Sequence, residues 1–185
     1  MIKSIEGNPN TKLHILYDGD SSFLSGNLNI IDFKGGSDWN SYVFAWNYAK
    51  NLDINHDDII FIAENDYMFL PEWPYKVQEL FNTYDSLDYV SLYDHPDKYS
   101  QNICSYIFVT KTHHWRTTPS TTGSVIFGKH ILEEDFDIHT TNPSDHGRFV
   151  ELYKTKQRTV LSPIPSLSTH CEIEYLTPVI EWEKI

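Results

Sequence analysis

The sequence predicts one α/β domain spanning residues 1–185, with a mostly parallel central sheet and helices on both faces. Short apolar segments with strand character alternate along the chain with segments that repeat their apolar residues at helical spacing. In the strand expected over residues 58–63, residues 59–63 are continuously apolar, as expected for a strand buried on both faces of a parallel sheet. The 185 residues are enough for one core, and no repeat or linker divides them.

The first half of the chain alternates strand and helix signals. Strands are expected over residues 12–17 and 29–33, each followed by a turn cluster that contains glycine. Ser37 or Asp38 can cap a helix that reaches about Asn51, because apolar residues recur there at helical spacing. The buried strand described above follows this helix.

The second half repeats the pattern. Pro71 and Pro74 stand where a helix begins, and residues 77–84 give that helix an apolar stripe. The remaining expected elements are strands over residues 89–93, 103–110, 124–127 and 159–161, a polar loop over 111–123, a helix over 142–156 with Asn142 as its cap, and an irregular tail over 163–185.

Composition narrows the classes of function. With 14 basic against 26 acidic residues the formal net charge is −12, which repels a phosphate backbone and argues against a nucleic-acid partner. Two cysteines make no disulfide framework and fit a reducing compartment. No apolar run is long enough for a membrane span, and no signal-peptide block follows the first residues, so we expect a cytoplasmic protein.

Two carboxylates follow directly on the buried strand over residues 58–63. Glu64 and Asp66 are spaced i, i+2, so in an extended segment their side chains point to the same side. Open α/β sheets bind ligands at the carboxyl ends of their strands. Two carboxylates held together repel unless a cation or proton intervenes, and hard oxygen ligands suit Mg²⁺ or Mn²⁺. The alternative is that both are solvated loop acids.

Three segments resemble the glycosyltransferases with the GT-A fold, closest to the family 2 type. Residues 59–67, IIFIAENDY, resemble the family's Asp-x-Asp region, with Glu64 in place of the more usual first Asp. Residues 13–21, LHILYDGDS, resemble its second strand, and residues 122–129, TGSVIFGK, resemble the segment before its acceptor-side helix. The motifs occur in the family's order. Residues 1–5 resemble only the end of the family's first helix, so its first strand–helix unit is expected to be missing.

The resemblance implies a GT-A-like fold and a metal-dependent transfer of a sugar from a nucleoside diphosphate sugar donor to a glycan or lipid-linked acceptor. It assigns Mn²⁺ or Mg²⁺ to Glu64, Asp66 and the late His170, and the general base of an inverting mechanism to Asp145, with Asp135 as its rival. It places Asp18, with Asp20 beside it, against the nucleobase, and Asn65 in the donor-binding turn. Arg116 is expected to pair with phosphate, since a guanidinium binds phosphate oxygens in pairs.

Each assignment has a structural alternative. Asp18 and Asp20 can accept backbone amides in a turn, and Asp145 lies in a helix opening where the dipole favours an acid. Asp135 can belong to a solvated helix end, and Arg116 to a solvated polar loop. The rival function is a non-catalytic carbohydrate- or nucleotide-binding module derived from the fold. A nucleotidyl- or phosphotransferase is less favoured because no Gly-rich phosphate loop with Lys is present.

Overall fold

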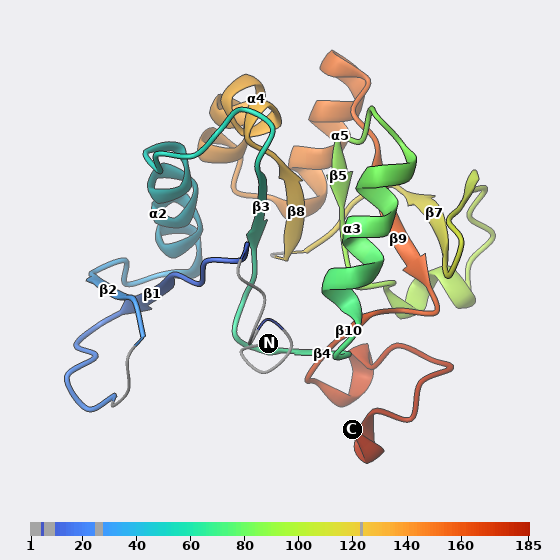
Figure 1. The fold of residues 1–185 in the computed structure, drawn as a ribbon, viewed down its shortest axis with the longest axis horizontal. Coiled ribbons are helices and arrows are strands. Elements are labelled where there is room, and N and C mark those ends of the chain that lie inside the picture. The colour runs from blue at the N-terminus through green and yellow to red at the C-terminus, as the bar shows by residue number, and fades with distance from the viewer. Residues whose placement is uncertain (1–4, 6–9, 25–27, 123) are drawn as a thin grey trace.

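A six-stranded mixed sheet forms the centre of the computed structural model, which describes residues 5, 10–24, 28–122 and 124–185 (Figure 1). Its strands, in spatial order, are β3 (Ile59–Ile62), β8 (Val125–Gly128), β5 (Tyr89–Val90), β9 (Val160–Ile164), β7 (His114–Thr118) and β6 (Ile107–Val109). The α/β class is therefore confirmed. The remnant of a first helix expected at residues 1–5 lies, apart from residue 5, outside the described residues.

The expectation of a mostly parallel sheet is wrong. Of the strand pairs in the described part of this sheet, only β5 and β9 run parallel, with Tyr89 opposite Val160. β8 runs antiparallel to β3 and to β5, and β7 runs antiparallel to β9 and to β6. The expected burial of this strand on both faces is also wrong, because β3 is an edge strand in which Ile59 is 45% exposed and only Ile60 is buried. A continuous apolar run specifies neither the place of a strand in its sheet nor the direction of its neighbours.

The expected polar loop over residues 111–123 contains a strand instead. β7 lies within it and forms a hairpin with β6, with Trp115 opposite Phe108. Only four residues, 110–113, join the two strands, and a connection this short permits only antiparallel neighbours. Trp115 is fully buried, which explains how a segment rich in polar residues holds a place in the sheet.

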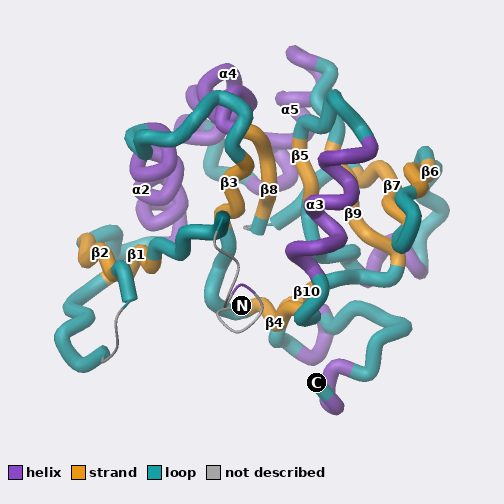
Figure 2. Tube along the Cα trace, viewed as in Figure 1, coloured by secondary structure: helices purple, strands orange, loops and turns teal. Residues whose placement is uncertain are grey.

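Two small sheets lie outside the central one. β1 (Ile15–Asp18) and β2 (Ile30–Phe33) pair in parallel beside the N-terminal end of α2. β4 (Tyr67–Phe69) and β10 (Ser168–His170) pair antiparallel (Figure 2). The expectation of an irregular tail over residues 163–185 is therefore wrong in part. The tail also contains the short helices η2 (Ile173–Tyr175) and η3 (Trp182–Lys184).

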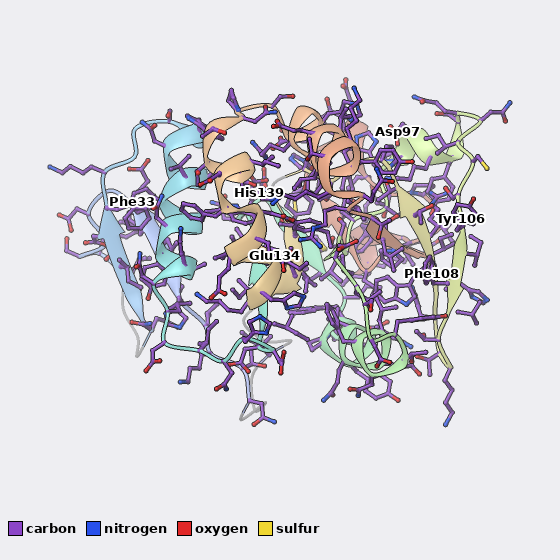
Figure 3. The ribbon with its side chains drawn as sticks, turned by 90° about the horizontal axis from the view of Figure 1, so that it is seen from above. Phe33, Asp97, Tyr106, Phe108, Glu134 and His139 are labelled. Atoms are coloured by element: carbon purple, nitrogen blue, oxygen red, sulfur yellow. The ribbon has the colours of Figure 1, made fainter. Side chains whose placement is uncertain are left out.

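Helices cover both faces of the central sheet, as predicted (Figure 3). The helices are α2 (Asp38–Lys50), α3 (Trp73–Thr83), α4 (Lys129–Thr141), α5 (Asp145–Lys156) and the short η1 (Pro96–Tyr99). One core cluster joins α3 to Val90 and Ile126, whereas the other joins α2, α4 and α5 to Tyr89 and Phe127. Consecutive strand residues thus enter opposite cores, as the two-residue period of a strand requires.

Serine side chains cap the first turns of α2 and α5. The Ser37 hydroxyl accepts a hydrogen bond from the Asn40 amide at 3.2 Å, so the predicted cap of α2 is confirmed. The expected cap of α5 is wrong, because Ser144, and not Asn142, accepts from the Gly147 amide at 3.0 Å. Asn142 instead ends α4. Among the described residues, no helix combines the length and apolar character that a membrane span requires.

Candidate functional site

The site begins at the carboxyl end of β3, where Glu64 and Asp66 lie in the turn that leads to β4. The Glu64 amide donates to Ser124 Oγ at 3.2 Å, which fastens this turn to the segment before β8. The pairing of β4 with β10 then brings the C-terminal part of the chain to the same turn. His170 Nε2 lies 3.1 Å from Asp66 Oδ2, and the Cys171 amide donates to the Asp66 carbonyl at 2.8 Å.

A cleft of about 350 Å³ opens beside this turn. Its walls come from the β3–β4 turn, the segment after β5 that contains Tyr93 and His95, the loop before β8, the start of α5 and the tail. The lining residues are Glu64, Tyr67, Tyr93, His95, Thr122, Asp145, His170 and Tyr175. Three of the residues singled out from the sequence, Glu64, Asp145 and His170, therefore face one hollow although they belong to separate elements.

The cleft holds a surplus of negative charge. Burial raises the pKa of Glu64 to about 7, and repulsion from Asp66 and Asp145 contributes to the rise. The Arg148 guanidinium offsets part of this effect. A carboxyl group in such surroundings is ionised at neutral pH only at a cost in free energy, which a bound proton or cation removes.

The donor set fits a divalent cation in its chemistry. Asp66 and His170 are in contact, and carboxylate oxygens with an imidazole nitrogen suit Mn²⁺ better than Mg²⁺. Glu64 faces the cleft beside this pair. As they stand, no three or more His, Cys, Asp or Glu side chains in the described part of the chain are gathered into a group that could hold a metal ion.

Asp145 lies both in the opening of a helix and at the cleft. It lies in the first turn of α5 and forms an ion pair with Arg148, one helical turn on, while its side chain remains about half exposed at the cleft. Arg148 is itself buried, donates to the Asn142 carbonyl at 3.0 Å and lies 4.0 Å from the centre of the Tyr42 ring. The pairing therefore gives the Asp145 carboxylate a fixed, charged neighbour.

Asp135 lies in a different environment. Its side chain is fully buried and accepts hydrogen bonds from Tyr89 Oη at 2.7 Å, Lys156 Nζ at 2.8 Å and Arg158 Nε at 2.9 Å. It is neither at a solvated helix end nor among the residues that line the cleft. Because its oxygens are occupied by cations and a hydroxyl, the geometry favours Asp145 over Asp135 as a base.

The expected nucleotide contacts have partners within the chain. Asp18 accepts from the Gly35 and Gly36 amides at 2.8 and 2.9 Å, and these hydrogen bonds lower its pKa. Asp20 accepts from the Ser22 amide at 2.9 Å. Both carboxylates therefore accept backbone amides, which is the structural alternative that the sequence offered to nucleobase binding.

Arg116 also has a carboxylate partner within the chain. The Arg116 Nε and Nη2 atoms bind the two oxygens of the buried Asp94 at 3.0 and 2.6 Å. Asn65 lies exposed in the turn between Glu64 and Asp66 and is not among the residues that line the cleft.

The aromatic wall of the cleft was not identified from the sequence. The Tyr67 ring packs edge-on against Tyr93 and against His170, with centroids 5.5 and 5.1 Å apart. Tyr93 Oη donates to the Tyr175 carbonyl at 2.8 Å, which ties the tail to the cleft. The available signal was the aromatic content of 15%, which does not say which rings gather. Such rings offer apolar faces and hydroxyl groups to a sugar or a base.

Comparison with protein-family models found no match, and none of the curated proteins matched the chain. The functional assignment therefore depends on the residues and the geometry of the cleft.

Proposed function

We propose that this protein is a glycosyltransferase that moves a sugar from a nucleoside diphosphate sugar to a glycan or lipid-linked acceptor. The observation that supports it is the meeting of Glu64, Asp145 and His170 on one aromatic-lined cleft at the carboxyl end of β3. In the transfer, an acceptor hydroxyl oxygen bonds to the anomeric carbon of the donor, the bond to the diphosphate oxygen breaks, and the hydroxyl proton passes to a base.

Asp145 is the base in this proposal. Its carboxylate faces the cleft, and the buried Arg148 beside it keeps it oriented. Tyr67, Tyr93 and Tyr175 supply ring faces and hydroxyl groups against which sugar rings can pack. A divalent cation held by Glu64, Asp66 and His170 would neutralise charge on the departing diphosphate.

The test is calorimetry of a nucleoside diphosphate with and without Mn²⁺, followed by transfer assays with nucleotide sugars. We expect Mn²⁺ to strengthen binding, and the substitution Asp66→Asn to remove this synergy without loss of fold. Asp57→Asn is the matched control, because the Asp57 side chain is 98% exposed and lies before β3. Equal affinity in Mn²⁺ and in a chelator would refute the metal-dependent proposal.

One observation favours a second candidate, a carbohydrate-binding module without transferase activity. Asp18 and Arg116, the expected contacts for base and phosphate, are both occupied by partners within the chain. Such a module would bind a glycan in the same aromatic cleft with no need of nucleotide or metal. Donor-dependent transfer separates the two functions, since the module binds glycan and transfers nothing.

A further inference from the structure

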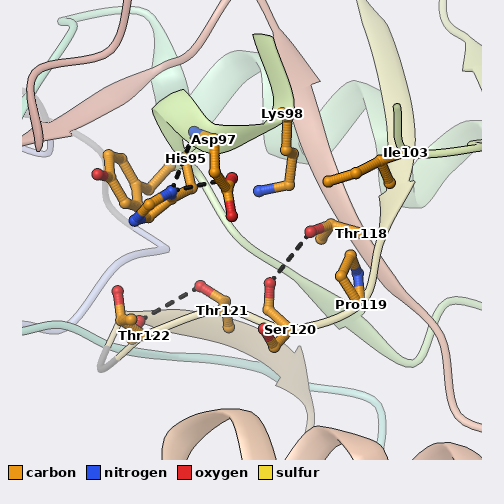
Figure 4. Close-up of a pocket in the computed structure, with 10 residues that line it drawn as sticks. His95, Asp97, Lys98, Ile103, Thr118, Pro119, Ser120, Thr121 and Thr122 are labelled. Atoms are coloured by element: carbon orange, nitrogen blue, oxygen red, sulfur yellow. Dashed lines mark hydrogen bonds and ion pairs between the residues drawn. The ribbon is translucent and has the colours of Figure 1, made fainter. Parts of the chain in front are cut away.

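A second, smaller hollow adjoins the cleft, which we call the side pocket (Figure 4). It has a volume of about 140 Å³ and lies between η1 and the loop that joins β7 to β8. Tyr93, His95 and Thr122 line both hollows, so a ligand in the cleft can extend into the side pocket. On this measure of volume one water molecule needs roughly 10–15 Å³, so the side pocket has room for a carboxylate or phosphate group.

The Lys98 side chain points into the side pocket (Figure 4). It is 5% exposed, and among the described residues its Nζ makes no hydrogen bond; the carboxylate oxygen within reach is Asp94 Oδ1, at 3.9 Å. That carboxylate already has closer partners, because Arg116 binds both of its oxygens and Ser162 and Tyr99 each donate to it at 2.8 Å. Lys98 therefore forms an ion pair with Asp94 but no hydrogen bond to it, and its N–H donors can bind a ligand.

Two carboxylates, Asp94 and Asp97, lie near the Lys98 ammonium that is directed at the pocket. Asp97 also lines the pocket; its Oδ1 lies 2.9 Å from His95 Nδ1, which accepts a hydrogen bond from the Asp97 amide. Burial lowers the pKa of Lys98, while Asp94 and Asp97 act in the opposite direction. A buried ammonium without hydrogen bonds is costly unless an anion satisfies it.

The opposite wall of the side pocket is polar and uncharged. Thr118, Ser120 and Thr121 come from the loop that faces η1. Ser120 Oγ lies 3.1 Å from His146 Nδ1, so this loop also contacts the start of α5 beside Asp145. A ligand group held between Lys98 and these hydroxyls would thus adjoin the proposed site of transfer.

We propose that the side pocket binds one anionic substituent of the acceptor, a carboxylate or a phosphate, with Lys98 as its cation. This inference rests on the proposed function and specifies it, because it makes the acceptor an acidic sugar: a uronic acid or a sugar phosphate. The facing loop is uncharged and does not repel the anionic group; its Thr118 and Thr121 hydroxyls donate to the Ser120 carbonyl and to Ser91 Oγ, which leaves the Ser120 hydroxyl to contact the ligand.

The test measures binding without donor or metal. We would titrate the full isotope-labelled chain with glucuronate, glucose 6-phosphate and glucose, and follow the amide NMR signals of residues 118 and 120–122. We expect one or both anions to shift these signals and glucose to leave them unchanged. Lys98→Met should weaken anion binding more than about tenfold, as loss of a charged hydrogen-bonding partner does. Lys154→Met, an exposed lysine of α5, is the control and should change nothing.

The two anions distinguish the sources of charge: shifts with glucuronate alone identify a carboxylate, and shifts with glucose 6-phosphate alone identify a phosphate. Equal binding of glucose and glucuronate in the unmodified protein would overturn the inference, and this comparison holds even if Lys98→Met fails to fold. Undiminished anion binding by a folded Lys98→Met would overturn it as well. Lys98-dependent anion binding without transfer from any donor would refute the proposed function and leave the pocket assigned.

Discussion

His139 joins three elements in the interior of the molecule and sets a testable pH dependence of stability. Its ring is fully buried in α4, stacked on Trp46 of α2 with centroids 3.7 Å apart. Nδ1 lies 2.7 Å from Tyr42 Oη, and Nε2 lies 3.0 Å from Tyr89 Oη, which donates to Asp135. Tyr42 therefore donates to the ring and Tyr89 accepts from it, an arrangement that requires the neutral imidazole.

The cost of protonating this ring gives the magnitude. Burial lowers the pKa of His139 to about 3 from its ordinary 6.5, and Arg148 adds to the effect. In the unfolded chain the histidine takes up a proton as the pH falls through 6.5, whereas the folded protein does so only near pH 3. The contribution of His139 to stability is therefore lost as the pH falls below 6.5, by about 2 kcal/mol between pH 7 and pH 5, whereas Glu64, with its raised pKa, contributes in the opposite direction over the same range.

Chemical denaturation followed by tryptophan fluorescence at about pH 7, 6 and 5 measures this loss. His139→Gln keeps hydrogen-bonding groups but cannot titrate, so its free energy of unfolding should be lower than that of the unmodified protein at neutral pH, and this difference should shrink as the pH falls to 5. His56→Gln is the matched control, since the His56 side chain is 68% exposed. Parallel pH profiles for the unmodified protein and His139→Gln would refute the reasoning.

The remaining predictions concern the acids and one cap. Asp145→Asn should lower transfer by roughly two to four orders of magnitude and also lower the melting temperature, because it leaves the buried Arg148 without its ion pair; a retained rate in the folded variant would exclude it as the base. Asp135→Asn should destabilise the fold by about 3–5 kcal/mol in denaturation experiments, because it removes a carboxylate that neutralises Arg158 and Lys156 in a buried network. Ser144→Ala should cost about 1 kcal/mol by the same measurement, with transfer unaffected.

The sequence predicted the kind and the approximate place of several elements, and failed on how they pair. α2 and α3 were found because capping and apolar spacing are local properties. β10 was missed because Ser168 to His170 has no strand pattern of its own, and it is a strand because Tyr67 to Phe69 offers it a partner. The direction of β8 between β3 and β5 is likewise set by contacts distant in sequence.

The residues of the candidate site differ in the same way in how far local sequence predicts their position. The position of Glu64 was predictable because a carboxylate at the end of an apolar strand is a local feature. That His170 lies against Asp66 follows from the pairing of β10 with β4, which local sequence does not specify. Here the resemblance to the glycosyltransferases supplied the expectation, and its assignment of a metal to this pair stays a prediction.

Arg116 was the cation that the sequence indicated for phosphate binding, whereas the structure directs Lys98 at a pocket. Arg116 stands beside two histidines and a tryptophan, a setting typical of a ligand-binding loop, but β7 turns its guanidinium onto the buried Asp94. Lys98 follows a proline and an aspartate, which indicates only a turn. Because Arg116 binds both oxygens of Asp94, the Lys98 ammonium stays 3.9 Å from that carboxylate and is directed at the side pocket. Which of the two cations Asp94 binds more closely follows from the pairing of β7 with β9, which local sequence does not specify.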